Sequence, residues 1–161
     1  MKKVLLNSIF LFFGGLIIGA LSKLFDIYSS NLGNIFSQLS VWILLGVLIS
    51  IYSKTKKNAM LNIFLFCIGM LISYYTIAEI TNSIYSWNFI IGWGIFACIS
   101  PIFAYFTWMT KEDKIFSKII SVGIILVSIL SSIVLFDRLR VYDFVIDGLL
   151  IYYLFIKKIE R

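Results

Sequence analysis

The sequence predicts an all-α fold: a polytopic transmembrane bundle of six spans that forms a single integral membrane domain over residues 1–161. Hydrophobic residues make up 61% of the chain, the mean hydropathy is +1.00, and only 14% of residues are charged. A soluble domain of this size could not bury so much apolar surface. The apolar residues fall into six segments of about 18 to 22 residues, each long enough to cross a bilayer as a helix, at about residues 4–25, 35–52, 59–78, 88–108, 115–136 and 139–156.

The first segment follows Lys2 and Lys3, as the apolar part of a signal peptide would. It is longer than the ~7–15 apolar residues of such a peptide, so we expect an uncleaved first helix. Gly15 and Gly19 lie four residues apart within it, and small residues at this spacing allow two helices to approach closely in lipid. They predict a packing face, and its partner is another helix of this chain, a second copy or a different subunit.

The four middle segments are separated by short loops, which leave no room for a second, soluble domain. Trp87 and Trp108 bracket the fourth segment, as is typical of aromatic residues at a membrane interface. Pro101 lies inside that segment and predicts a kink, because proline removes a backbone donor from the helix.

The sixth segment is unusual because it carries charges inside an apolar stretch. Asp147 lies ten residues before Lys157, which places it ~15 Å deep in a hydrocarbon layer of ~30 Å. A carboxylate at that depth costs about 2.5 kcal/mol or more, so it should face protein or water. Arg140 and Asp143 share its helix face and would complete a polar stripe. If this segment does not cross, the chain has five spans and its C-terminus lies outside.

The distribution of basic residues predicts the orientation. With six spans, only three basic residues lie on one side, and they are Lys23, Arg138 and Arg140. The rest lie on the other side, at Lys2, Lys3, Lys54, Lys56, Lys57, Lys111, Lys114, Lys118, Lys157, Lys158 and Arg161. Because cytoplasmic loops carry the excess of lysine and arginine, both termini are expected in the cytoplasm of a multi-pass cell-membrane protein.

The outer half then collects the candidate functional residues. Lys23 and Asp26 lie one turn apart at the end of the first segment, and Glu79 closes the third at a similar depth. Together with Arg140, Asp143 and Asp147 they leave three interpretations open. The charges fix helix packing, or they line an outward-facing pocket for a small polar or cationic solute, or Asp147 and Glu79 relay protons.

Enzymatic function is not expected. The chain has no histidine, which excludes Ser-His-Asp and Cys-His nucleophile systems and the common zinc sites. No phosphate-binding glycine loop occurs, and Cys67 and Cys98 show neither metal nor disulfide spacing. We therefore expect no catalytic residues, no metal and no cofactor. The net charge of +6 comes from short clusters between apolar segments, so no nucleic-acid partner is expected.

Two resemblances follow from particular stretches. Gly15 to Asp26, Trp42 to Gly46 and Leu65 to Tyr75 resemble a family of uncharacterised six-span membrane proteins of Gram-positive bacteria, which implies no particular activity. The architecture is also similar to that of the S components of energy-coupling-factor vitamin transporters. That resemblance implies a solute site on the outer side and a first helix, here with Gly15 and Gly19, that docks a coupling subunit.

The expected function is therefore solute binding or transport in the lipid bilayer, with the outer charges contacting the solute. The alternative is a scaffold or accessory subunit that transports nothing and holds another membrane protein, or a second copy of itself.

Overall fold

In the computed structural model, the chain is described except for residues 1–6, 30–32, 34, 37, 84–85 and 160–161. The prediction of an all-helical fold is confirmed for the described residues, which contain helices and no strand. The helices are α1 (Ser8–Tyr28), α3 (Leu39–Ile51), α4 (Lys56–Ile80), α5 (Trp87–Met109), α6 (Ile115–Phe136) and α7 (Val141–Ile151), and α7 continues into a π-helical turn, η1 (Tyr152–Ile156).

Four of these helices are long and apolar enough to cross a membrane, namely α1, α4, α5 and α6. The helix α3 is apolar but has only 13 residues. The last helix, α7, has 11 residues before η1 begins. Pro101 lies inside α5, which runs on past it to Met109.

Short polar residues begin three of the helices. The side chains of Asn7, Thr55 and Ser86 accept hydrogen bonds from backbone N–H groups in the first turns of α1, α4 and α5. Such caps satisfy donors that a helix start leaves without a partner. The chain turns after α6 through Asp137, which has a left-handed backbone with φ of 54°.

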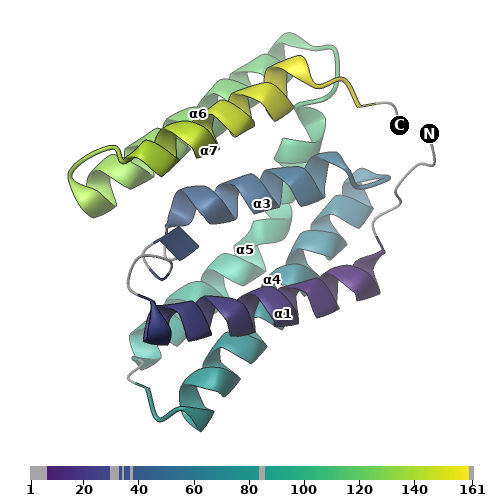
Figure 1. The fold of residues 1–161 in the computed structure, drawn as a ribbon. Helices are drawn as coiled ribbons and strands as arrows, with labels where there is room; N and C mark the ends of the chain where they lie inside the picture. The colour runs from purple at the N-terminus through teal and green to yellow at the C-terminus, as the bar shows by residue number, and fades with distance from the viewer. Residues whose placement is uncertain (1–6, 30–32, 34, 37, 84–85, 160–161) are drawn as a thin grey trace.

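The bundle is arranged around α3, as Figure 1 shows. This helix packs against α4 and α5 on one side and against α6 and α7 on the other. The helix α1 lies along α4, which is its main neighbour.

Two apolar clusters make up the core, and α3 contributes to both. Ile49 packs with residues of α1, α4 and α5, which are Leu11, Ala59, Ile63, Phe66 and Ala104. Val47 and Ile51 face the other way and pack with Ile146, Leu150 and Leu154. The short central helix therefore joins the α1–α4–α5 part to the α6–α7 part.

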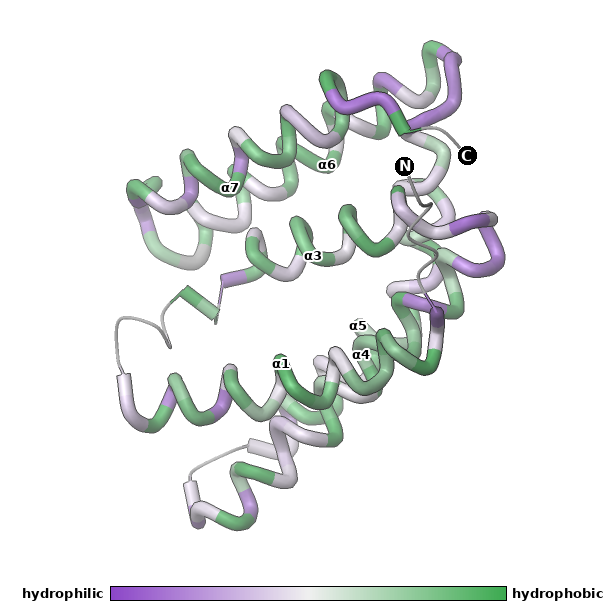
Figure 2. Tube along the Cα trace, turned by 45° about the vertical axis from the view of Figure 1, so that its right-hand side comes forward, coloured by the Kyte–Doolittle hydropathy of each residue, from purple (hydrophilic) through white to green (hydrophobic). Residues whose placement is uncertain are grey.

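The outer surface of the helices is apolar, while many small polar residues are buried. Exposed large apolar side chains occur on every long helix, among them Phe10, Ile17, Ile72, Ile95, Ile119 and Val134. Buried polar residues include Asn62, Ser100, Ser121, Ser128 and Ser132. Hydrophilic residues gather mainly at the helix ends and loops (Figure 2). This distribution suits helices whose surroundings are hydrocarbon rather than water.

One end of the bundle is tied together by polar contacts between helices. Asn62 accepts from Ser8 Oγ at 2.6 Å and donates to Ser53 Oγ at 2.8 Å, while Trp108 Nε1 donates to the Ser53 carbonyl at 2.9 Å. Lys111 Nζ donates to the carbonyl of Leu154 at 3.0 Å. The start of α1 and the end of η1 therefore lie at the same end of the bundle, which we call the basic end.

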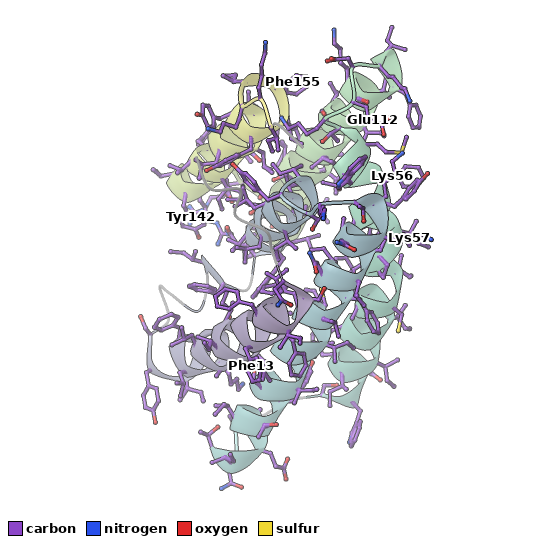
Figure 3. The ribbon with its side chains drawn as sticks, turned by 90° about the vertical axis from the view of Figure 1, so that its right-hand side faces the viewer. Phe13, Lys56, Lys57, Glu112, Tyr142 and Phe155 are labelled. Carbon is purple, nitrogen blue, oxygen red and sulfur yellow. The ribbon has the colours of Figure 1, made fainter. Side chains whose placement is uncertain are left out.

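Two salt bridges involve Glu112, which lies in the loop between α5 and α6 at this end. Lys56 Nζ lies 2.9 Å from Glu112 Oε1 (Figure 3). Lys114 Nζ lies 2.9 Å from Glu112 Oε2. Hydrogen bonds from these two lysines, with the larger effect from Lys56, lower the pKa of Glu112 to about 2. The hydrogen bond to Glu112 in turn raises the pKa of Lys114.

Candidate functional site

The end of the bundle opposite the basic end contains a cavity of about 360 Å³, which we call the charged cavity. It is lined by α1, α4, the start of α5 and neighbouring residues of the segment before and within α3. The lining residues are Ser22, Lys23, Asp26, Gly33, Phe36, Trp42, Met70, Leu71, Tyr74, Tyr75, Ser86, Phe89 and Trp93. Two of the six residues predicted for the solute site, Lys23 and Asp26, are therefore found in one cavity wall.

A buried ion pair forms the polar part of this wall. Lys23 Nζ lies 3.1 Å from Asp26 Oδ2, and the lysine side chain is only 5% exposed whereas that of Asp26 is 48% exposed. The ammonium also lies 5.2 Å from the centre of the Tyr74 ring, within cation–π range, and Tyr74 Oη donates to Asp26 Oδ2 at 3.4 Å. A lysine ammonium has three N–H donors, and the contacts described for Lys23 use one of them on a carboxylate.

Glycines in α1 bring this pair against α4. A Cβ on Gly15 would overlap the carbonyl oxygen of Phe66, and one on Gly19 would overlap that of Met70. The next turn of both helices places Lys23 beside Tyr74. The two helices therefore run in parallel in constant register, and the predicted small-residue face of α1 lies against α4 of the same chain.

Arg140, Asp143 and Asp147 lie elsewhere, between α6 and α7. Ser128 Oγ donates to Asp147 Oδ1 at 2.7 Å, and Ser132 Oγ donates to Asp143 Oδ1 at 3.1 Å. Both carboxylates are largely buried, with exposed fractions of 9% for Asp147 and 1% for Asp143. Neither carboxylate lines the charged cavity or the apolar cavity defined below.

Arg140 precedes α7 rather than lying on its face. Its backbone N–H donates to Asp143 Oδ2 at 2.7 Å, so Asp143 caps the start of the helix. Its side-chain Nε lies 3.6 Å from the same oxygen, and its guanidinium stacks on Phe136 at 3.4 Å from the ring centre. Arg140, Asp143 and Ser132 thus form one packed network at the turn between α6 and α7.

Glu79 occupies a third position. It lies near the end of α4 with an exposed side chain and does not line either cavity. The six predicted solute-site residues are therefore distributed over three places: the charged cavity, the α6–α7 contact and the end of α4.

Sequence reasoning missed the partners of these charges. Tyr74 follows Met70 by one turn, as Lys23 follows Gly19. This matched spacing was the signal in the sequence that could have paired Lys23 with Tyr74. Ser128 and Ser132 are four residues apart, as are Asp143 and Asp147, which suits two antiparallel helices joined by a short turn. Serine hydroxyls aligned in this way satisfy buried carboxylates.

A second cavity, of about 460 Å³, lies deeper between α3, α4, α5 and α6, and we call it the apolar cavity. Its walls are almost entirely hydrocarbon, with Ile63, Phe66, Phe96, Phe103 and Val127 among them. Four residues line both cavities: Trp42, Met70, Leu71 and Trp93. The two cavities are therefore neighbours that share one wall.

The described residues contain no group of three or more histidine, cysteine, aspartate or glutamate side chains that could hold a metal ion. Cys67 and Cys98 are free thiols on α4 and α5. The charged cavity therefore offers one ammonium, one carboxylate and aromatic walls.

Fold and site together describe an all-helical protein with four membrane-length helices and a charged cavity at one end of its bundle. The chain belongs to a family of unknown function, DUF6518, which it matches over residues 1–137. The matched range includes Lys23, Asp26 and Tyr74 and ends before α7, so Asp143 and Asp147 lie beyond it. No curated protein and no solved structure matches the chain.

Proposed function

We propose that the chain is a multi-pass cell-membrane protein with six spans and both termini in the cytoplasm, as in the six-span proteins of Gram-positive bacteria that it resembles. Support comes from the apolar outer surface and from the lysines gathered at the basic end. In this arrangement α3 and α7 with η1 complete the bundle as short crossings surrounded by longer helices.

Within this arrangement the protein binds a small polar solute in the charged cavity, from the outer side, and serves in transport. The single observation that carries this proposal is the Lys23–Asp26 ion pair, because it brings an ammonium and a carboxylate into the wall of a space large enough for a ligand. The role is binding rather than catalysis, since the chain lacks histidine and the catalytic motifs sought in it.

The architecture also supports a comparison with S components of energy-coupling-factor transporters, in which a six-span subunit holds its solute on the outer side. In this chain Gly15 and Gly19 face α4, so a coupling partner would dock on a different surface. The α6–α7 network has a structural role in this proposal, fixing the last helix against α6.

Native mass spectrometry of the protein purified in mild detergent from its own host tests the proposal. The wild-type protein should carry a small molecule that is lost in Lys23→Met, because this substitution keeps the length of the side chain and removes its charge. Lys118→Met is the matched control, since Lys118 is exposed on α6 and lines neither cavity.

A chain that carries no small molecule and is bound to another protein would contradict solute binding. That result would favour the alternative function, an accessory subunit. The orientation is tested separately with a reporter enzyme fused to the C-terminus. A reporter that works only in the cytoplasm should be active there.

A further inference from the structure

We infer that the ligand is an amphiphile: an anionic head group, carboxylate or phosphate, at Lys23, joined to an apolar chain or ring that enters the apolar cavity. This inference rests on the proposed solute-binding function. It keeps the polar head group at Lys23 and adds an apolar part to the solute.

The shared wall of the two cavities is the first observation. Trp42 of α3, Met70 and Leu71 of α4 and Trp93 of α5 line both spaces. A molecule bound at the Lys23 end therefore lies next to the deeper space, separated from it by these four side chains. Methionine and aromatic side chains adapt to apolar ligands of irregular shape.

The second observation is that the apolar cavity suits hydrocarbon rather than water. Two of the hydroxyls in its wall are used within their own helices: Ser50 Oγ donates to the Gly46 carbonyl at 2.7 Å and Ser100 Oγ to the Ala97 carbonyl at 2.8 Å. Ordered water needs two to four polar partners, which such walls do not supply. A space of about 460 Å³ falls in the range of ligand sites.

The third observation is the sign of the buried charge. Lys23 is the enclosed member of the ion pair, while Asp26 is half exposed and already accepts from both Lys23 and Tyr74. An anionic oxygen can accept from the ammonium N–H groups that the described contacts leave over. A cationic head group would instead meet the ammonium of Lys23 in the wall of the charged cavity, where like charges repel.

The test uses ω-bromododecanoate, whose bromine quenches tryptophan fluorescence, titrated into the full-length protein in a neutral detergent. We expect saturable quenching of Trp42 and Trp93, with an affinity at least about ten-fold higher than that of two matched probes. The first is ω-bromobutyrate, which keeps the head and shortens the chain. The second is ω-bromododecyl trimethylammonium, which keeps the chain and reverses the charge.

Two substitutions separate the head from the tail. Gly123→Leu fills the apolar cavity from α6, where an added Cβ meets no atom within 4 Å, and should weaken ω-bromododecanoate binding about ten-fold or more while leaving ω-bromobutyrate unchanged. Lys23→Gln should weaken both anionic probes. Gly14→Leu is the control, since Gly14 has equally open space and lines neither cavity.

Competition then identifies the source of the ligand, either a membrane lipid or a soluble amphiphile. With the protein in phosphatidylcholine nanodiscs, displacement of the probe by added lysophosphatidylglycerol supports a lipid ligand. Displacement only by a water-soluble aromatic carboxylate supports a soluble one. Either result supports an anionic head on an apolar body.

Three results would overturn the inference. Equal affinity for ω-bromobutyrate and ω-bromododecanoate, unaffected by Gly123→Leu, would remove the apolar cavity from the site. Equal affinity for ω-bromododecanoate and for the cationic probe would show that the site does not select an anionic head group. Absence of saturable binding by any probe would overturn the amphiphile as well. In each case the proposed solute binding survives if the host-derived molecule is still lost in Lys23→Met, and fails with the inference if the wild-type protein carries none.

Discussion

The α1–α4 contact and the α6–α7 contact each hold an ion pair with the same spacing in sequence, yet the two pairs have different surroundings. Lys23 and Asp26 are one turn apart, as are Arg140 and Asp143. The first pair faces a cavity, whereas the second is enclosed by Ser132, Phe136 and the start of α7. What the opposite helix supplies decides whether such a charge lies beside a cavity or is enclosed between helices.

The two contacts also differ in how the helices approach each other. In α1–α4 the backbones meet through Gly15, Gly19 and Gly69, where an added Cβ would overlap backbone atoms of the other helix. The glycines of α6 and α7 do not form such a contact, since Gly123 lines the apolar cavity and Gly148 is exposed. Side-chain hydrogen bonds from Ser128 and Ser132 join these two helices instead. Close backbone packing and hydrogen bonding are the two principal means of helix association in lipid.

The largest expected effect is from Gly19→Leu, which breaks the close contact. The new side chain must displace the Met70 carbonyl, so we expect a loss of about 3 kcal/mol in folding stability, the upper part of the usual cost of overpacking. Thermal unfolding in detergent, followed by size-exclusion chromatography, measures it. Gly148→Leu introduces the same side chain at an exposed position of α7 and should unfold near the wild-type temperature. Equal losses in the two variants would contradict the role of the close backbone contact at Gly19.

The second effect concerns ligand binding. Lys23→Met should weaken binding about ten-fold, or about 1.4 kcal/mol, with little change in unfolding temperature. The reason for the small structural effect is that Asp26, left without its partner, is half exposed and stays hydrated. The amount of bound small molecule in native mass spectra gives the affinity change. A variant that fails to fold would show instead that Lys23 is needed for packing.

A smaller effect is expected from Asp147→Leu in the α6–α7 contact. It removes the acceptor for Ser128 Oγ, and one interhelical hydrogen bond in lipid is worth about 1 kcal/mol of folding stability. Asp147→Asn keeps an acceptor oxygen and should unfold near the wild-type temperature. Ligand binding should persist in both variants, because Asp147 lines neither cavity. Loss of ligand in Asp147→Asn at full stability would move the solute site to α7.

The smallest effect is a pH dependence at the basic end. Lys56 and Lys114 lower the pKa of Glu112 from 4.5 to about 2, so its contribution to stability is present above about pH 4.5 and is lost as the pH falls towards 2. The unfolding temperature should therefore fall slightly over this range, and the Glu112→Gln variant should lack that part of the change. An identical pH profile in the variant would assign it to other carboxyl groups.

The sequence was sufficient for the helical class, because apolar segments of this length form helices in a membrane. It was not sufficient for the number of crossings, since four of the six predicted segments form helices of membrane length, whereas α3 and α7 are shorter. Nor was it sufficient for the neighbours of the charged residues. Lys23 and Arg140 look alike along the chain, and only the packing of α1 on α4 places Tyr74 and a cavity beside one of them. Arg140 was expected on the face of a helix, but the helix begins after it, since Asp143 accepts its backbone N–H.

The spatial order of helices escapes sequence reasoning for a physical reason. Short loops allow several arrangements, and the apolar segments have similar composition on all sides. The parallel contact of α1 with α4 depends on Gly15 meeting Phe66 and Gly19 meeting Met70, and such a register needs both partners to be known.

The most direct test of the central claim measures ligand occupancy and unfolding temperature together in Lys23→Met and Asp147→Leu. We expect Lys23→Met to lose the bound molecule and keep its unfolding temperature, and Asp147→Leu to keep the bound molecule and unfold at a lower temperature. The reverse pattern, with ligand lost from Asp147→Leu and stability lost from Lys23→Met, would contradict the assignment of the charged cavity to binding and of the α6–α7 contact to packing.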